Sequence, residues 1–230
     1  MQNISFKAGE TIYTNTLAGE KSVEDWVREG EVLTKTWQNK LLLENKLDPE
    51  EYGDHAHWVL WCPVEIPDKV VIKWEFYPIK EPGLCMLFFA ARGRNGEDLF
   101  DKSLPERTGY YPQYHSGAIN ALHLSYFRHK HPDERAFRTC NLRKSNGFHL
   151  VTQAADPLPP VDDAVSPYLM QLVKYEQYVQ FSINNMVILE WKDDGRSFGP
   201  ILHGGRIGFR QMAPMVAAYA NLSVSHAMIN

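Results

Sequence analysis

Short apolar runs separated by turn-forming residues recur along most of this chain. Several alternate with a period of two: Val179, Phe181 and Ile183 fall on one face of an extended segment, and Gln180 and Ser182 fall on the other. Turn signals such as EPG, SNG and DDG lie between the runs. The pattern predicts β-strands over 57–62, 70–77, 84–91, 118–128, 135–142, 168–175, 178–191, 206–211 and 216–224.

Helical periodicity is scarce by comparison. Only 21–29, opened by Ser22 as an N-cap, resembles a short helix, and Asn184-Asn185 predicts the turn of a hairpin within 178–191. Many short strands with few helices are typical of two packed antiparallel sheets. We therefore expect an all-β jelly-roll β-sandwich forming one domain over 1–230, with a first strand near 10–16 paired with the last near 216–224. The segment 153–167, with its four prolines, is expected to be a surface loop.

Composition agrees with a folded globular protein. The chain has 230 residues, of which 44% are hydrophobic and 12% aromatic, and this excludes disorder. Its longest apolar run, at 83–91, suits a buried strand and predicts no membrane span. Cys62, Cys85 and Cys140 form no CxxC pair, which argues against a disulfide framework or a structural zinc site. The start lacks the layout of a secretory signal, so we expect a cytoplasmic protein.

Charge is distributed unevenly. The window from His123 to His149 has a net charge of +4, whereas the whole chain has −4, so the remainder carries −8. Local charge excess of this kind commonly faces a partner. Nucleic acid is disfavoured as that partner because the acidic remainder would repel a long polyanion. The six basic residues of the window are Arg128, Lys130, Arg135, Arg138, Arg143 and Lys144.

Several catalytic patterns are absent or weak. A sandwich glycosidase commonly carries carboxylates on alternate residues of one strand, and no such stretch occurs. His55 and His57, and likewise His129 and His131, have the HxH spacing that can hold a metal. Cupins place a carboxylate four or five residues after such a pair, whereas Glu65 lies eight residues after His57. The second pair runs directly into Pro132, Asp133 and Glu134, which resemble a turn. We therefore expect loop histidines, with no metal and no cofactor. A metal-dependent cupin-like enzyme using His55 and His57 is retained as the weakest alternative.

The basic window also contains aromatic residues, a mixture suited to an acidic sugar. Sugar rings stack on aromatic faces, and guanidinium groups pair with uronate carboxylates. Alternation predicts that His123 and Ser125 share a strand face, as do Asn141 and Arg143 on the next strand. If these faces form one groove, Arg143 and Asn141 could neutralise a uronate carboxylate while His123 or a tyrosine removes the C5 proton, as in a β-eliminating lyase.

Longer motifs point to a family. The runs PGLCMLFFAA, YHSGAINALHLSYFR, FRTCNLRKSNGFHL and GRIGFRQMAPM make the chain similar to the YesU-like proteins over about 26–224. That resemblance implies a galectin-like or concanavalin-like sandwich and a role in using plant cell-wall rhamnogalacturonan, but it supplies no catalytic residues. The family's distinctive polar stretches correspond to 126–128, 141–144 and 210–211, which we expect to converge on one concave face.

These observations define a hypothesis. We expect a carbohydrate-active protein that binds or processes an acidic pectic oligosaccharide, or else a non-catalytic galectin-like sugar-binding module, with no nucleic-acid or membrane partner. The candidate catalytic residues are His123 and Tyr126. The candidate ligand-binding residues are Arg128, Arg138, Asn141, Arg143, Lys144, Arg210, Gln211, Glu75 and His57.

Overall fold

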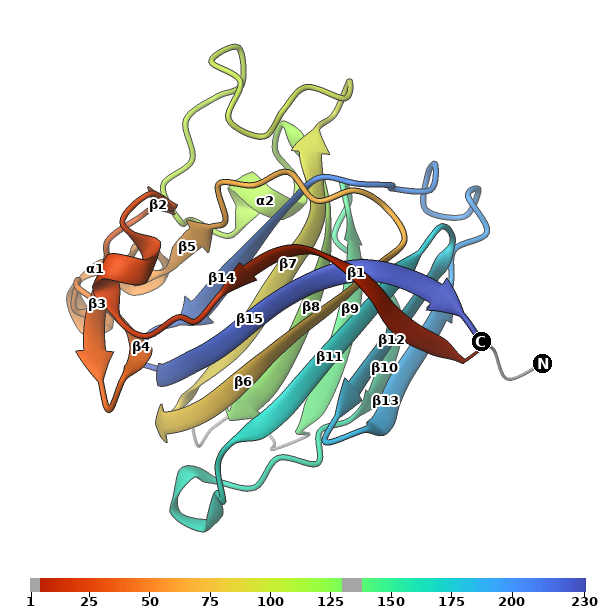
Figure 1. The fold of residues 1–230 in the computed structure, drawn as a ribbon. Helices are drawn as coiled ribbons and strands as arrows, with labels where there is room; N and C mark the ends of the chain where they lie inside the picture. Colours follow the sequence, from red (N-terminus) through yellow and green to blue (C-terminus); the bar gives the residue numbers. More distant parts are fainter. Residues whose placement is uncertain (1–4, 130–137) are drawn as a thin grey trace.

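Two antiparallel sheets pack face to face in the computed structural model, which describes residues 5–129 and 138–230 (Figure 1). In the first, sheet A, the strand order is β13 (Met186–Lys192), β12 (Tyr178–Ile183), β11 (Tyr168–Tyr175), β6 (Val70–Lys80), β15 (Val216–Ile229), β4 (Lys40–Asn45) and β3 (Val32–Trp37). Strand β1 (Phe6–Asn15) also pairs with β15. In the second, sheet B, the order is β10 (His149–Ala155), β9 (Thr139–Ser145), β8 (Ile119–His129), β7 (Gly83–Gly93), β14 (Arg206–Met212), β5 (Trp58–Trp61) and β2 (Val27–Glu29).

Helical structure is limited to single turns in the described part of the chain. These are α1 (Pro49–Tyr52), α2 (Pro112–His115) and the 3-10 turns η1 (Glu20–Val23), η2 (Gly53–Ala56) and η3 (Val161–Asp163). None of the described helices is long and apolar enough to cross a membrane.

The predicted sandwich is confirmed. The first strand pairs with the last, with Thr11 opposite Ser225, and Figure 1 shows β1 lying along β15. Asn184 and Asn185 adopt φ angles of 49° and 64° at the turn between β12 and β13, as expected of residues that tolerate positive φ.

The helix expected over 21–29 is wrong. The segment forms the η1 turn and then β2, in which Val27 pairs with Trp61 of β5. Pairing with a neighbouring strand therefore overrides a weak local helical pattern. The predicted loop over 153–167 begins too early because β10 continues to Ala155. The described part of the expected 135–142 strand is β9, which begins at Thr139.

Apolar side chains cover both faces of sheet B. Its inner face packs against sheet A in a core that includes Trp58, Leu87 and Phe209 of sheet B and Trp74 and Phe76 of sheet A. On its outer face, a second buried cluster includes Val59, Trp61, Met86, Phe88 and Tyr114. Tyr114 belongs to the long connection between β7 and β8, so this connection covers part of the outer face.

A buried ion pair ties β9 to the segment that follows β13. Nζ of Lys144 donates to Oδ2 of Asp193 at 2.6 Å and to the carbonyl of Gly199 at 3.0 Å. Both charged side chains are almost completely buried. Removing one partner would leave the other charge desolvated and unpaired.

We expect Asp193→Ala to lower the free energy of unfolding by about 3 to 5 kcal/mol, the usual cost of breaking a buried pair. Urea unfolding followed by fluorescence measures this. Glu44→Ala is the control because it removes the exposed Lys35–Glu44 pair, and it should cost less than about 1 kcal/mol. Equal losses in the two variants would contradict a stabilising role for Lys144 and Asp193.

Candidate functional site

The outer face of sheet B brings together polar residues from the three strands β14, β8 and β9. In the register, Arg210 of β14 is opposite Met86 of β7, Met86 is opposite Ser125 of β8, and Ser125 is opposite Asn141 of β9. The next row places His123 opposite Arg143. Because alternate residues face the same side of a strand, these polar groups share the face opposite to the core residues Leu124 and Leu142.

The connection over 94–118 is fixed to this face by a buried ion pair. Nε and Nη2 of Arg107 donate to the carboxylate of Glu29 at 2.7 to 3.2 Å, and the Tyr114 hydroxyl donates to the same carboxylate at 2.7 Å. The Tyr114 oxygen also accepts the Gly109 N–H at 3.0 Å. The bidentate geometry fixes the path of the connection and thereby the position of Tyr111.

Arg210 lies beneath this connection. Its side chain is 1% exposed, Nη1 donates to the carbonyl of Gly109 at 2.6 Å, and Cζ lies 4.7 Å from the ring centre of Tyr111. Nη2 is 3.2 Å from Nδ1 of His57, which must accept because a guanidinium only donates. No carboxylate of the described residues is within ion-pair distance of Arg210. Among the described residues, the direct contacts of this guanidinium are with neutral dipoles and π systems.

The His123 imidazole contacts the Tyr111 hydroxyl. The Tyr111 hydroxyl lies 3.2 Å from Nδ1 of His123, and the His123 side chain is completely buried. Burial, with smaller contributions from His115, Arg210 and Arg143, holds the pKa of His123 well below its usual value. His123 is therefore a neutral imidazole that holds the Tyr111 hydroxyl, and its ring is not open to a ligand.

The part of this face that reaches the surface is formed by Arg128, Arg143, Tyr111 and Phe148 around the buried Asn141, and we call these five residues the arginine face. Nη1 of Arg128 donates to Oγ1 of Thr139 at 2.7 Å and lies 2.7 Å from the Asn141 amide, whose oxygen is placed on that side to accept.

Arg143 stacks on an aromatic ring at this face. Its Cζ lies 4.0 Å from the ring centre of Phe148, and its Nη1 donates to the Phe148 carbonyl at 3.1 Å. The half-exposed Arg143 and the 36% exposed Phe148 ring both reach the surface. The Arg143 guanidinium and the exposed edge of the Phe148 ring are therefore available side by side.

The remaining predicted site residues lie elsewhere. Tyr126 is buried in the inter-sheet core against Phe76, and the Gln211 amide is 2.9 Å from the Tyr219 hydroxyl in the same core. Lys144 is held by Asp193, so none of these three reaches the outer face of sheet B. Tyr126 alternates in phase with the core residues Leu122 and Leu124. A β-bulge with positive φ at Phe127 turns Phe127 inward as well and Arg128 outward.

Three more predicted residues are also separate from the arginine face. Glu75 belongs to sheet A, where its carboxylate accepts from the Tyr77 hydroxyl at 2.6 Å and from Asn221 Nδ2 at 2.9 Å. His57 is buried beside Arg210. The Arg138 side chain is exposed at the start of β9. Six residues that entered the charge and metal arguments lie outside the described residues: Lys130, His131, Pro132, Asp133, Glu134 and Arg135.

The histidine pairs do not form a metal-binding group within residues 5–129 and 138–230, where no set of three or more potential ligands converges. His55 stacks on Tyr110 with ring centres 4.7 Å apart, whereas His57 is buried against Arg210. His129 pairs with Glu81.

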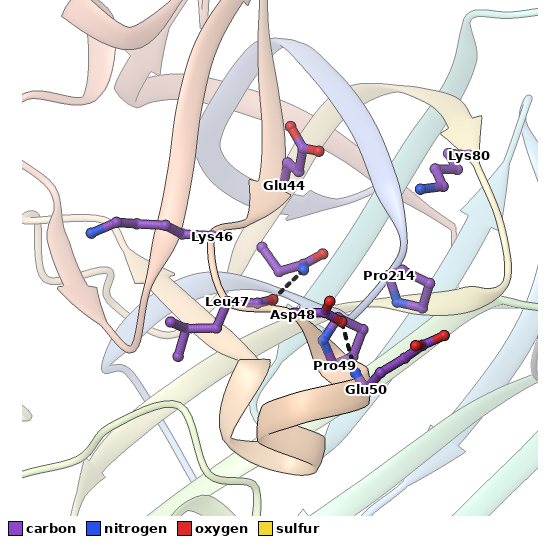
Figure 2. A pocket seen from close by; sticks show the side chains of 9 residues that line it. Glu44, Lys46, Leu47, Asp48, Pro49, Glu50, Lys80 and Pro214 are labelled. Atoms are coloured by element: carbon purple, nitrogen blue, oxygen red, sulfur yellow. Dashed lines mark hydrogen bonds between the residues drawn. The ribbon is translucent and has the colours of Figure 1, made fainter.

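A pocket of about 600 Å³ lies at another part of the molecule, between β4, α1, the end of β6 and Pro214 (Figure 2). Its polar groups are already in use: Asp48 accepts from the backbone N–H of Glu50, and the Asn45 amide donates to the Leu47 carbonyl. Acidic and basic side chains line it together. This pocket therefore has no single charge to attract an ionic ligand, in contrast to the arginine face.

Comparison with solved structures defines the class of protein. The chain is similar to a Bacillus subtilis protein of unknown function with a galectin-like fold, at 55% identity and a TM-score of 0.93, covering 98% of this chain and 100% of that chain. The carbohydrate recognition domain of Emp47p matches at 12% identity and TM-score 0.58, covering 93% and 95%. A Bacillus licheniformis β-glucanase matches at 8% and 0.57, covering 95% and 99%. The last two likenesses show the fold alone. The protein is thus a galectin-like β-sandwich.

The family follows from sequence comparison. A domain family of unknown function, DUF1961, matches residues 10–224. The uncharacterised protein YesU of Bacillus subtilis is 56% identical over 223 residues, which cover 97% of this chain and 99% of that protein. The chain belongs to this YesU-like family, as the sequence motifs predicted.

The buried His57 predicts a pH dependence of stability. Burial, followed by the nearby Arg210 charge, lowers its pKa from 6.5 to about 4, and the exposed Asp54 carboxylate offsets this only partly. The unfolded chain therefore binds the proton more tightly, so stability falls as pH falls from about 6.5 to about 4. At pH 5 the contribution of His57 should be about 2 kcal/mol less favourable than at pH 7.

Urea unfolding of the wild type and of His57→Gln at these two pH values tests this. The glutamine carbonyl can accept from Arg210 but does not titrate, so the variant should lose about 2 kcal/mol less between pH 7 and pH 5. Equal losses in both proteins would show that His57 is protonated in the folded state.

Proposed function

We propose that the arginine face binds a short acidic oligosaccharide. The observation that carries this proposal is the meeting of Arg128 and Arg143 with Asn141 and the aromatic rings of Tyr111 and Phe148 on one sheet face. No carboxylate of the described residues forms an ion pair with either arginine. A guanidinium in partly desolvated surroundings gains more from a ligand carboxylate than one fully exposed to water.

The geometry suits a sugar better than a simple anion. Arg143 and His115 cover the two faces of the Phe148 ring, and its exposed edge offers an apolar surface against which a pyranose can pack. Arg143 stacks against the same Phe148 ring. A single uronate residue could therefore place its carboxylate at Arg143 and its sugar ring at Phe148. Burial lowers the pKa of Arg143, as does the nearby Arg128 charge. A bound anion would offset both the desolvation of the guanidinium and its repulsion by Arg128.

The comparisons support this class of ligand. Two of the proteins with the same fold are a carbohydrate recognition domain and a β-glucanase. The choice of a galacturonate-containing pectic fragment as the ligand rests on the use of rhamnogalacturonan that the resemblance to YesU-like proteins implies. The reaction that these groups suit is β-elimination, because an arginine-paired carboxylate acidifies the adjacent C–H bond.

Arg143→Gln is expected to weaken binding of a rhamnogalacturonan tetrasaccharide by roughly 10-fold to 100-fold, since a hydrogen bond to a charged group contributes about 1.5 to 3 kcal/mol. Isothermal titration calorimetry measures the Kd. Arg28→Gln is the matched control because Arg28 is exposed on β2 at the far edge of sheet B, and its Kd should equal that of the wild type.

Two further ligands separate charge from shape in the same assay. Trigalacturonate should bind more tightly than its methyl ester, which keeps the sugar rings but lacks the negative charge, and added salt should reduce the difference. Failure of all three ligands to bind would overturn the proposed function. Binding that is unaffected by Arg143→Gln would place the ligand elsewhere on the protein.

A further inference from the structure

His115 has the geometry of an oriented base beside the arginine face. It ends the α2 turn, and its Nδ1 lies 2.6 Å from Oγ of Ser116. Its ring packs 4.2 Å from the ring centre of Phe148 and 5.0 Å from that of Tyr111. The side chain is half-buried, and its Nε2 makes no hydrogen bond within the described part of the chain. One nitrogen is thus held in place by a neighbour while the other is free to meet a ligand.

The backbone keeps His115 next to the residues of β9 and β10. Its carbonyl accepts the Gly147 N–H at 2.8 Å, within the turn that leads to Phe148. The Asn146 amide also donates to the Gly117 carbonyl at 2.6 Å. These two hydrogen bonds join the α2 turn to the β9–β10 turn, so His115, Tyr111 and Phe148 form one cluster with fixed spacing.

Burial and nearby charges give His115 and Tyr111 different protonation states at neutral pH. Partial burial, then the charges of Arg143 and Arg210, lowers the pKa of His115, so its imidazole is neutral near pH 7. Burial raises the pKa of Tyr111 to about 12, although three arginines act in the opposite direction. At neutral pH the cluster therefore holds an unprotonated imidazole next to a protonated phenol.

We propose that His115 and Tyr111 are the catalytic base and acid of a uronate β-elimination at the arginine face. This inference rests on the proposed function, because it requires the uronate carboxylate to be bound by Arg143 and Arg128. It replaces Tyr126, which lies in the inter-sheet core, and leaves the buried His123 as a positioning residue for the Tyr111 hydroxyl.

The reaction balances without another reactant. Nε2 of His115 takes the C5 proton, and the electron pair of the C5–H bond forms the C4–C5 double bond. The C4–O bond breaks, and the departing oxygen takes the phenolic proton of Tyr111. Proton transfer from the His115 imidazolium to the Tyr111 phenolate, through water, restores both residues. The arginine-paired carboxylate stabilises the negative charge that develops during proton removal.

The test measures binding and turnover separately, with a rhamnogalacturonan tetrasaccharide and with trigalacturonate. Calorimetry gives the Kd, and ultraviolet absorbance of the conjugated unsaturated uronate gives the rate. We expect His115→Gln and Tyr111→Phe each to lower kcat by roughly 100-fold or more, the usual contribution of a general acid or base, with Kd changed less than about threefold. Tyr110→Phe and His55→Gln are the matched controls, because these two residues stack on each other away from Phe148 and should keep wild-type rates.

The pH profile provides a readout that a purely structural role would not change. Wild-type kcat should fall at acid pH as His115 becomes protonated, and this limb should disappear from the residual activity of His115→Gln. Tight binding without product for either substrate overturns the inference and leaves the proposed function standing as a sugar-binding module. Absence of binding overturns the proposed function itself. Full turnover by His115→Gln or Tyr111→Phe overturns the assignment of that residue.

Discussion

The buried contact of Glu29 with Arg107 and Tyr114 determines whether this sandwich has a site at all. Without it, the 94–118 connection would have little reason to lie across sheet B, because its own sequence forms only the four-residue α2 turn. The bidentate ion pair and the Tyr114 hydroxyl neutralise one carboxylate completely, which makes burial of all three groups tolerable. Arg210 is covered, Tyr111 is placed over His123, and His115 is brought to the β9–β10 turn as consequences of this one contact.

Charge and burial then act together on the exposed side of that connection. Arg128, Arg143 and Arg210 raise the local positive potential, and all three influence the Tyr111 hydroxyl. Arg210 is almost completely buried, so it can act on an anion only through its electrostatic potential. Arg143 can contact a ligand directly. This division explains how a protein with net charge −4 can present a locally positive surface, to which we propose that an acidic sugar binds.

The strand faces were predictable because alternation is a local property. The placement of Asn141 and Arg143 opposite Cys140 and Leu142 needed only the period-two pattern. Alternation also places Tyr126 with Leu122 and Leu124 on the core side of β8, so the candidate role of Tyr126 did not fit the pattern. A β-bulge at Phe127 then changes the phase and brings Arg128 to the outer face. A bulge leaves no reliable sign in a single sequence. No sequence pattern indicated a role for His115 either. Its contacts Gly147 and Phe148 lie in the turn between β9 and β10, more than thirty positions further along the chain.

The sequence by itself determined the all-β class, most of the strands, the family and the polar face of β8 and β9, since each depends on short-range periodicity or on long motifs. Tertiary structure alone decided which residues meet. The bulge at Phe127 brought Arg128 to the outer face, the ion pair with Asp193 holds Lys144 away from it, and the anchored connection added Tyr111 and His115. Contacts between distant segments depend on strand order and on burial of particular ion pairs, and neither is encoded in the local pattern of polar and apolar residues.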